Sequence, residues 1–196
     1  MNDPDSATLF KWKRLIERLQ TYDRIGIALS GGVDSALVCA AAVQALGTKN
    51  VIAYTIESPM EIPQEVEDAR QVAESLGVEL FRIPLDELEI EEIRSNPSQR
   101  CYFCKRERLK IIKEQAHLSG ITQLVDGSNA DDLSDYRPGR QALQELGVLS
   151  PLAETGITKA EVRQLAKWKG LSVWEKPSTP CLASRCSCHA STCFLV

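Results

Sequence analysis

The chain has 196 residues, of which 43% are hydrophobic and 26% are charged, with a formal net charge of −4 at pH 7. This balance is typical of a globular protein and excludes a disordered or fibrous chain. The length suits one well-buried domain with a small appendage. The weak negative charge provides no overall attraction to nucleic acid.

The amino terminus, MNDPDSATLF, carries acids where a secretory signal would carry positive charge. No apolar run approaches the roughly 20 residues that span a bilayer. We therefore expect a cytoplasmic protein with no membrane partner. Seven cysteines in that compartment favour metal binding, sulfur chemistry or plain burial over a disulfide framework.

Strands and helices alternate along most of the chain. Apolar runs rich in β-branched residues predict strands at 24–29, 50–58, 78–85 and 121–128. Helical periodicity predicts helices at 9–19, 35–47, 61–77, 100–118 and 158–171. This alternation predicts an α/β fold, an open and mostly parallel sheet with helices on both faces and ligands at the strand ends.

The stretch SGGVDS, residues 30–35, follows the first predicted strand and opens a helix. Such a turn presents backbone N–H groups and the positive end of the helix dipole to an anion. Hydroxyls of Ser30 and Ser35 would add donors. The lysine and the spacing of a Walker A loop are absent. We expect a phosphate site here, with an ordinary strand-to-helix turn as the alternative.

SGGVDS resembles the signature of the PP-loop ATP pyrophosphatases. The resemblance implies cleavage of ATP between its α and β phosphates, with pyrophosphate in the loop and magnesium beside Asp34, a predicted catalytic residue. Thr55 and Ile56 would lie near the adenine of ATP; packing of both side chains in the core is the alternative. The nucleotide would contact Ala28, Ser30, Gly31, Gly32, Val33, Asp34, Ser35, Thr55, Ile56 and Gly127.

Four further segments narrow the resemblance: RCYFCK (100–105), DGSNADDLSDYRPGRQAL (126–143), SPLAETGITKAEVRQLAKWKGL (150–171) and KPSTPCLASR (176–185). Together they are similar to the LarE family of pyridinium-3,5-biscarboxylic acid mononucleotide sulfur transferases. The resemblance implies adenylation of a carboxylate of a small-molecule nucleotide and replacement of AMP by sulfur. The thiocarboxylate product belongs to nickel-pincer cofactor biosynthesis, and family members assemble into homo-oligomers.

Cys101 and Cys104 form a C-x-x-C pair, and Cys181 lies far downstream. Three thiolates are one short of a closed tetrahedral site, which indicates chemistry rather than support. The resemblance implies a 4Fe-4S cluster on these three cysteines, or Cys181 alone as a sacrificial sulfur donor; both make Cys181 catalytic. A structural zinc pair, completed by Cys188 or His189, or two buried thiols are the other interpretations.

The acidic segment 126–135 follows the fourth predicted strand, where it would orient ATP or magnesium; a solvated loop is the alternative. Asp131 and Asp132 are the candidate magnesium ligands. Four residues after this segment are candidate phosphate or substrate contacts: Arg137, Arg140, Ser184 and Arg185.

Beyond CLASR the sequence CSCHASTCFLV matches nothing in the family, so we expect residues 1–175 to form the PP-loop domain and 176–196 a truncated or altered start of the sulfur-transfer region. A tRNA-thiolating PP-loop enzyme is an alternative, against which the acidic balance counts. A non-catalytic module that binds ATP or metal is the third possibility. Cys39, in an alanine-rich helix, is expected to be buried, and His117 to lie on the surface.

Overall fold

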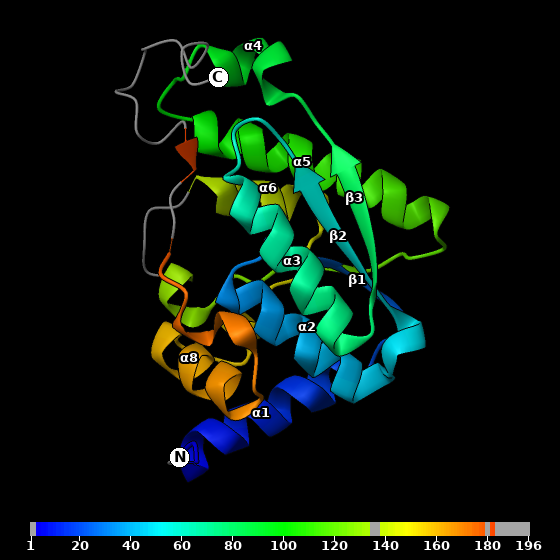
Figure 1. The fold of residues 1–196 in the computed structure, drawn as a ribbon, viewed down its shortest axis with the longest axis vertical. Helices are drawn as coiled ribbons and strands as arrows, with labels where there is room; N and C mark the ends of the chain where they lie inside the picture. The colour runs from blue at the N-terminus through cyan, green and yellow to red at the C-terminus, as the bar shows by residue number, and fades with distance from the viewer. Residues whose placement is uncertain (1–2, 134–137, 179–180, 183–196) are drawn as a thin grey trace.

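The fold is built on a parallel sheet that runs through the middle of the molecule (Figure 1). The computed structural model describes residues 3–133, 138–178 and 181–182. Within them the sheet has four strands in the order β3-β2-β1-β4. They are β1 (Ile25–Ala28), β2 (Val51–Glu57), β3 (Glu79–Pro84) and β4 (Leu124–Val125).

Helices cover both faces of this sheet. On one face lie α2 (Val33–Leu46) and α3 (Pro63–Leu76), with α1 (Ser6–Leu19) and α8 (Lys159–Trp168) packed outside α2. The other face is covered by α5 (Arg100–Leu118) and α6 (Gly139–Leu146). Short helical turns join these elements: Thr48–Asn50, Glu87–Glu89, α4 (Glu91–Arg94), Ala130–Leu133, α7 (Pro151–Glu154) and Ser172–Glu175.

Strand β2 shows why the sheet needs cover on both sides. Val51 and Ala53 enter the core beneath α2, whereas Ile52, Tyr54 and Ile56 enter the core beneath α5. Because both faces are buried, the strand reads as a continuous apolar run rather than an alternating one.

The predicted α/β architecture is confirmed, with two local differences. The fourth strand is shorter than predicted because only Leu124 and Val125 pair with β1. On their other side Val125 forms a single parallel bridge with Leu149, in which the Asp126 N–H donates to the Leu149 carbonyl at 2.9 Å. The sequence also gave no signal for the short helices α4 and α7. Among the helices that the structure describes, none is long and apolar enough to cross a membrane.

Candidate active site

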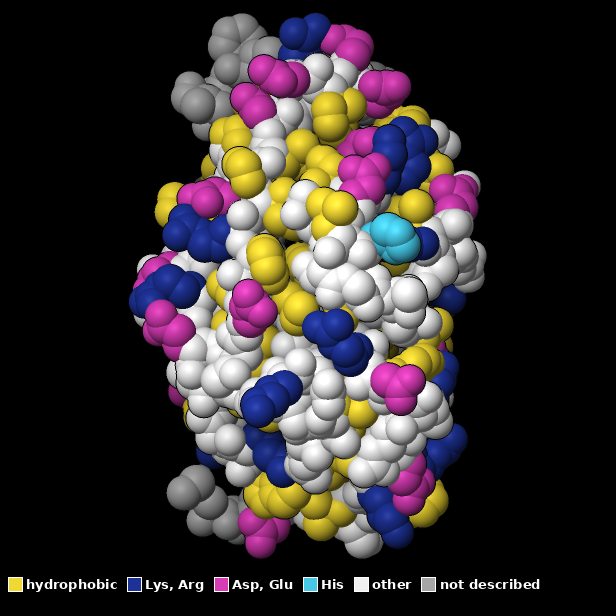
Figure 2. All heavy atoms as spheres, turned by 90° about the vertical axis from the view of Figure 1, so that its right-hand side faces the viewer, with side chains coloured by type: hydrophobic (Ala, Val, Ile, Leu, Met, Phe, Trp, Pro, Cys, Tyr) yellow, Lys and Arg dark blue, Asp and Glu magenta, His cyan; other side chains and the backbone are white. Residues whose placement is uncertain are grey.

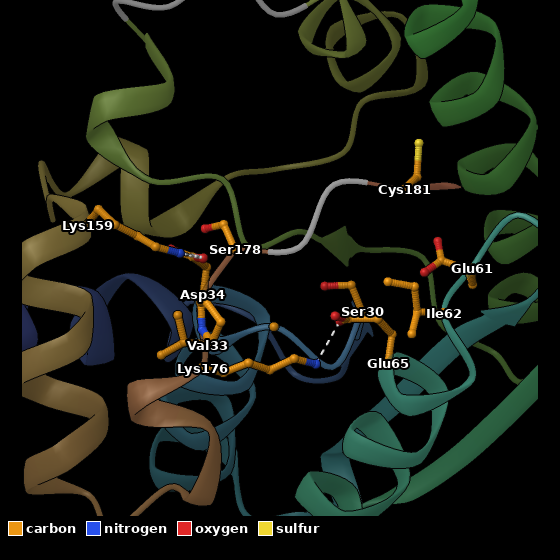
Figure 3. A pocket seen from close by; sticks show the side chains of 12 residues that line it. Ser30, Val33, Asp34, Glu61, Ile62, Glu65, Lys159, Lys176, Ser178 and Cys181 are labelled. Atoms are coloured by element: carbon orange, nitrogen blue, oxygen red, sulfur yellow. Dashed lines mark hydrogen bonds and ion pairs between the residues drawn. The ribbon is translucent and has the colours of Figure 1, made fainter. Parts of the chain in front are cut away.

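The glycine loop joins β1 to α2 and is closed by a serine hydroxyl. Ser35 Oγ donates to the Gly32 carbonyl at 3.1 Å and accepts from the Ser30 N–H at 3.2 Å. Ser35 is buried, and its hydroxyl, which the sequence predicts as a phosphate donor, also holds the loop in shape. Ser30 faces the open space above the loop (Figure 3).

Two glycines are required by close backbone contacts. Gly31 has a φ of +74°, and a Cβ there would lie 2.1 Å from the carbonyl oxygen of Glu65 in α3. At Gly127 a Cβ would lie 2.6 Å from the backbone nitrogen of Ser35. At Gly127 the turn after β4 therefore rests on the first turn of α2.

Replacing Gly31 with alanine should destabilise the protein strongly. A left-handed alanine costs about 1–2 kcal/mol, and the contact with α3 adds about 1–3 kcal/mol of overpacking. Gly147→Ala is the matched control, since Gly147 also has a positive φ, +63°, but nothing within 4 Å of its added Cβ. Denaturant unfolding should show a clearly larger loss for Gly31→Ala; equal losses would mean that α3 moves aside.

The first cavity, of about 420 Å³, opens where the strands end. Its apolar wall carries Ala28, Thr55 and Ile56 from β1 and β2, and Leu109 and Ile112 from α5. The structure gathers here most of the residues that the sequence singled out. They are Ala28, Ser30, Asp34, Ser35, Thr55, Ile56, Cys101, Cys104, Gly127, Asp132 and Cys181.

The second cavity, of about 350 Å³, lies beside the glycine loop, with Gly32 and Val33 in its lining (Figure 3). It shares Ser30, Asp34 and Cys181 with the first cavity. The two cavities therefore meet at the glycine loop and at Cys181.

Two lysines from the carboxyl-terminal part of the chain reach this loop (Figure 3). Lys159, the first residue of α8, forms an ion pair with Asp34. Lys176 Nζ lies 3.2 Å from the Gly31 carbonyl oxygen and pairs with Glu65 at 2.9 Å and with Asp68. The positive charge that the loop lacks is thus supplied from elsewhere, and sequence analysis missed it because neither lysine lies within the phosphate motif.

The acidic segment meets the loop through Asn129. The side-chain amide of Asn129 donates to Asp34 Oδ1 at 3.0 Å, and its backbone N–H donates to Asp132 Oδ2 at 2.9 Å. Asp131 instead accepts from the backbone N–H of Lys159 at 2.9 Å and does not line either cavity. Asp34 and Asp132 are therefore the two candidate magnesium ligands that share a cavity.

Asp126, directly after β4, is a buried carboxylate with a full set of donors. Burial acts to raise the pKa of the Asp126 carboxyl, but Lys105 at 2.9 Å and the hydroxyls of Ser150 and Ser128, each at 2.7 Å, outweigh it and lower the pKa. Neither Asp126 nor Lys105 was predicted as a site residue, although they lie within DGSNADDLSD and RCYFCK.

This pKa shift makes a prediction about acid stability. A carboxyl whose pKa is lower in the folded state stabilises that state above its unfolded pKa, here about 3.8, and the contribution is lost as the pH falls through the folded value. The unfolding free energy should therefore decline less between about pH 4 and pH 2 in Asp126→Asn than in the wild type. The exposed Glu92→Gln is the control; an unchanged profile for Asp126→Asn would remove Asp126 from this role.

The three predicted sulfur ligands line one cavity, the larger of the two. Cys101 and Cys104 lie in the first turns of α5, and Cys181 approaches from the carboxyl-terminal segment. Cys104 Sγ lies 3.5 Å from Glu87 Oε1, and burial raises the pKa of the Cys104 thiol to about 12. In the described part of the chain no group of three His, Cys, Asp or Glu residues is arranged to hold a single metal ion.

Some predicted residues fall outside this arrangement. Arg140 donates to the Leu133 carbonyl at 2.8 Å and lines neither cavity. Arg137, Ser184 and Arg185 lie outside the described residues, as do Cys186, Cys188, His189 and Cys193. Cys39 is buried and His117 exposed, as expected.

The NAD synthase family model matches residues 13–127, more than half of the chain. The match includes all four strands and the glycine loop. The chain belongs to the NAD synthase family. This assignment confirms the PP-loop family expected from SGGVDS.

Curated relatives of this NAD synthase family member include proteins of more than one activity. An uncharacterized protein of Synechocystis is 46% identical over 89% of this chain and 65% of its own length. The pyridinium-3,5-bisthiocarboxylic acid mononucleotide synthase of Lactiplantibacillus plantarum is 34% identical over 87% of this chain and 62% of its own length, which confirms the LarE resemblance. The NH(3)-dependent NAD(+) synthetase of Archaeoglobus fulgidus is 32% identical over 85% and 73%. The chain spans less than two thirds of the first two relatives.

Solved structures confirm the fold. NMN synthetase from Francisella tularensis superposes with a TM-score of 0.70 at 20% identity, covering 89% of this chain and 76% of that one. Glutamine-dependent NAD+ synthetase from Acinetobacter baumannii gives 0.70 at 21% identity over 92% and 38%.

Proposed function

We propose that this NAD synthase family member is an ATP-dependent sulfur transferase. It would adenylate a carboxylate of a pyridinium dicarboxylate mononucleotide, release pyrophosphate and replace AMP by sulfur to give a thiocarboxylate. The observation that carries the proposal is the position of Cys181, which lines both cavities together with Ser30 and Asp34. A thiol at the junction of a nucleotide cavity and a second cavity suits transfer of sulfur to an adenylated substrate.

The charge distribution supports the first half-reaction. Adenine would lie against the apolar wall of the larger cavity, which directs the phosphates toward the glycine loop and the amino end of α2. The substrate carboxylate attacks the α-phosphorus, and the bond to the β-phosphate breaks. Lys159 and Lys176 would exchange their carboxylate partners for the oxygens of the departing pyrophosphate.

The second half-reaction transfers sulfur. A sulfur nucleophile attacks the adenylated carbonyl carbon, and AMP leaves. If the sulfur belongs to Cys181, the product is released when the Cβ–S bond breaks with loss of the Cα proton, leaving dehydroalanine. Each chain would then complete a single turnover.

Magnesium would be held by Asp34 and Asp132, whose carboxylates are linked through Asn129. Two carboxylates are a normal protein contribution to a magnesium site, the rest coming from water and phosphate oxygens. The ion would neutralise charge on the phosphates.

An iron–sulfur cluster would be held by Cys101, Cys104 and Cys181, three thiols that line one cavity and so match its donor type and number. Such a cluster would supply an iron atom with an open position for an extra sulfide. Cys104 would have to lose the proton that burial and Glu87 favour. Iron and acid-labile sulfide, measured on protein purified without oxygen, distinguish a cluster from a single-use Cys181.

The decisive test is incubation with ATP, magnesium and the dicarboxylate mononucleotide. We expect AMP, pyrophosphate and a thiocarboxylate whose absorption and mass differ from those of the substrate. No AMP or pyrophosphate in the presence of bound substrate would refute the proposed function. Binding of ATP without adenylation would favour a non-catalytic module.

Ammonia-dependent synthesis of NAD+ is the second candidate, favoured by the family match and by the Archaeoglobus relative. It needs no thiol at the junction of the cavities, so NAD+ formation that survives Cys181→Ala would establish it. A tRNA-thiolating activity has less support: in Figure 2, basic side chains lie apart with acidic ones among them. Salt-sensitive tRNA binding would revive it.

Residues 1–175 would form the PP-loop unit, and 176–196 would begin the sulfur-transfer region. Lys176 and Cys181 support this division, since both return from the end of the chain to the glycine loop or its cavities. Association into a homo-oligomer remains a proposal carried over from the family.

A further inference from the structure

Arg100, at the start of α5, places its guanidinium between two of the three sulfur atoms. Nη2 lies 3.5 Å from Cys101 Sγ and 3.9 Å from Cys181 Sγ. Arg100 is only 6% exposed and lines the larger cavity. A guanidinium is planar, always charged and weakly hydrated, and so it suits a buried position against an anion.

Asn96 aims this guanidinium. Its Oδ1 accepts from Arg100 Nη1 at 2.6 Å, and Asn96 itself is 2% exposed. Asn96 has a φ of +49°, a conformation that asparagine tolerates better than most side chains, and it follows α4. The Asn96 side chain, fixed in a buried turn, thereby holds Nη1 of Arg100, and Nη2 points toward the sulfur atoms.

The neighbouring cations in this cavity are engaged with carboxylates. Lys105 pairs with Asp126 at 2.9 Å, and Arg108 pairs with Glu61 and with Glu87. The guanidinium of Arg100 contacts the sulfur atoms of both Cys101 and Cys181.

We propose that Arg100, aimed by Asn96, is the positioning residue that holds negatively charged sulfur between Cys101 and Cys181. This inference rests on the proposed sulfur transfer, and it adds the group that keeps the anionic sulfur at the junction of the cavities. Arg100 forms and breaks no covalent bond. Its charge attracts the anion, and its fork fixes the positions of the two sulfur atoms.

The local charge can be measured with a matched pair of thiol reagents. The full chain, reduced and freed of iron, is treated with an anionic and with a cationic methanethiosulfonate, and the rates at Cys101 and Cys181 are followed by peptide mass. In the wild type the anionic reagent should be favoured. Arg100→Gln should lower the anionic-to-cationic rate ratio about tenfold at both cysteines, because a buried charge is weakly screened.

Two further variants separate this role from a general effect on folding. Asn96→Gly tolerates the positive φ but removes the acceptor, and it should lower the ratio several-fold while Arg100 is still present. Arg106→Gln, on the same helix but paired with Glu107 and stacked on Tyr102, should leave the ratio unchanged. Because both reagents attack the same thiol, altered accessibility affects both rates and largely cancels in the ratio.

An unchanged ratio in Arg100→Gln, or an equal fall in Arg106→Gln, would overturn the proposal. The measurement needs neither ATP nor substrate. A failed adenylation assay would therefore refute the proposed function and leave the labelling result standing, whereas an unchanged ratio in an active enzyme would refute the role of Arg100 alone.

Discussion

Cys181→Ala is expected to abolish thiocarboxylate formation while AMP and pyrophosphate are still released. The thiol lies where the two cavities meet, whereas the glycine loop and both lysines are untouched by the change. Loss of an essential nucleophile should lower product formation by at least about 10³-fold. Chromatography of the nucleotides and mass spectrometry of the product measure the two half-reactions separately.

Three other cysteines make this experiment specific. Cys39→Ala should leave both half-reactions intact, because Cys39 is buried in α2 and lines neither cavity. If Cys101→Ala and Cys104→Ala also abolish sulfur transfer, the three cysteines act as a set, as a cluster requires. If each of these variants still yields up to one product per chain, Cys181 is the donor. Thiocarboxylate made by Cys181→Ala would refute its role.

The fold was predictable because its signals are local and agree with one another. The apolar runs of β1 and β2 end at turn residues, and Thr158 and Glu161 form the capping box that their spacing predicts. The length of β4 was overestimated because only Leu124 and Val125 pair with β1, and a local pattern does not reveal how many residues pair with a strand that is distant in the sequence. The fold was predicted where local signals agree with one another.

The sequence predicted which residues gather at the site, but not how hydrogen bonds and ion pairs connect them. The glycine motif placed Ser30 and Asp34 at the carboxyl edge of the parallel sheet, and the LarE resemblance placed Cys181 at the site of the chemistry. Whether a side chain faces ligand or closes its own loop depends on hydrogen bonds, and the bonds of the Ser35 hydroxyl to Ser30 and Gly32 were not predictable from the motif. Lys176 was missed because a lone lysine in a loop carries no sequence signature of a phosphate site.

Asp34→Ala should abolish pyrophosphate release and leave the fold largely intact. Asp34 lies in the first turn of α2 with a partly exposed side chain, and its loss frees Lys159 to reach solvent. What the protein loses is a carboxylate shared by both cavities and linked through Asn129 to Asp132. We expect ATP cleavage to fall about 10²–10³-fold, the usual effect of removing one preorganised electrostatic group.

Lys159→Gln distinguishes two reasons for that loss. The Lys159→Gln variant removes the ion pair but keeps the Asp34 carboxylate. If Asp34 binds magnesium, added magnesium should not restore ATP cleavage in Asp34→Ala or in Asp34→Asn. The Lys159→Gln variant should then keep the magnesium dependence of the wild type. If Asp34 serves only to hold Lys159, Asp34→Asn and Lys159→Gln should lose activity equally and respond to magnesium alike. A normal pyrophosphate yield from Asp34→Ala would remove Asp34 from the active site.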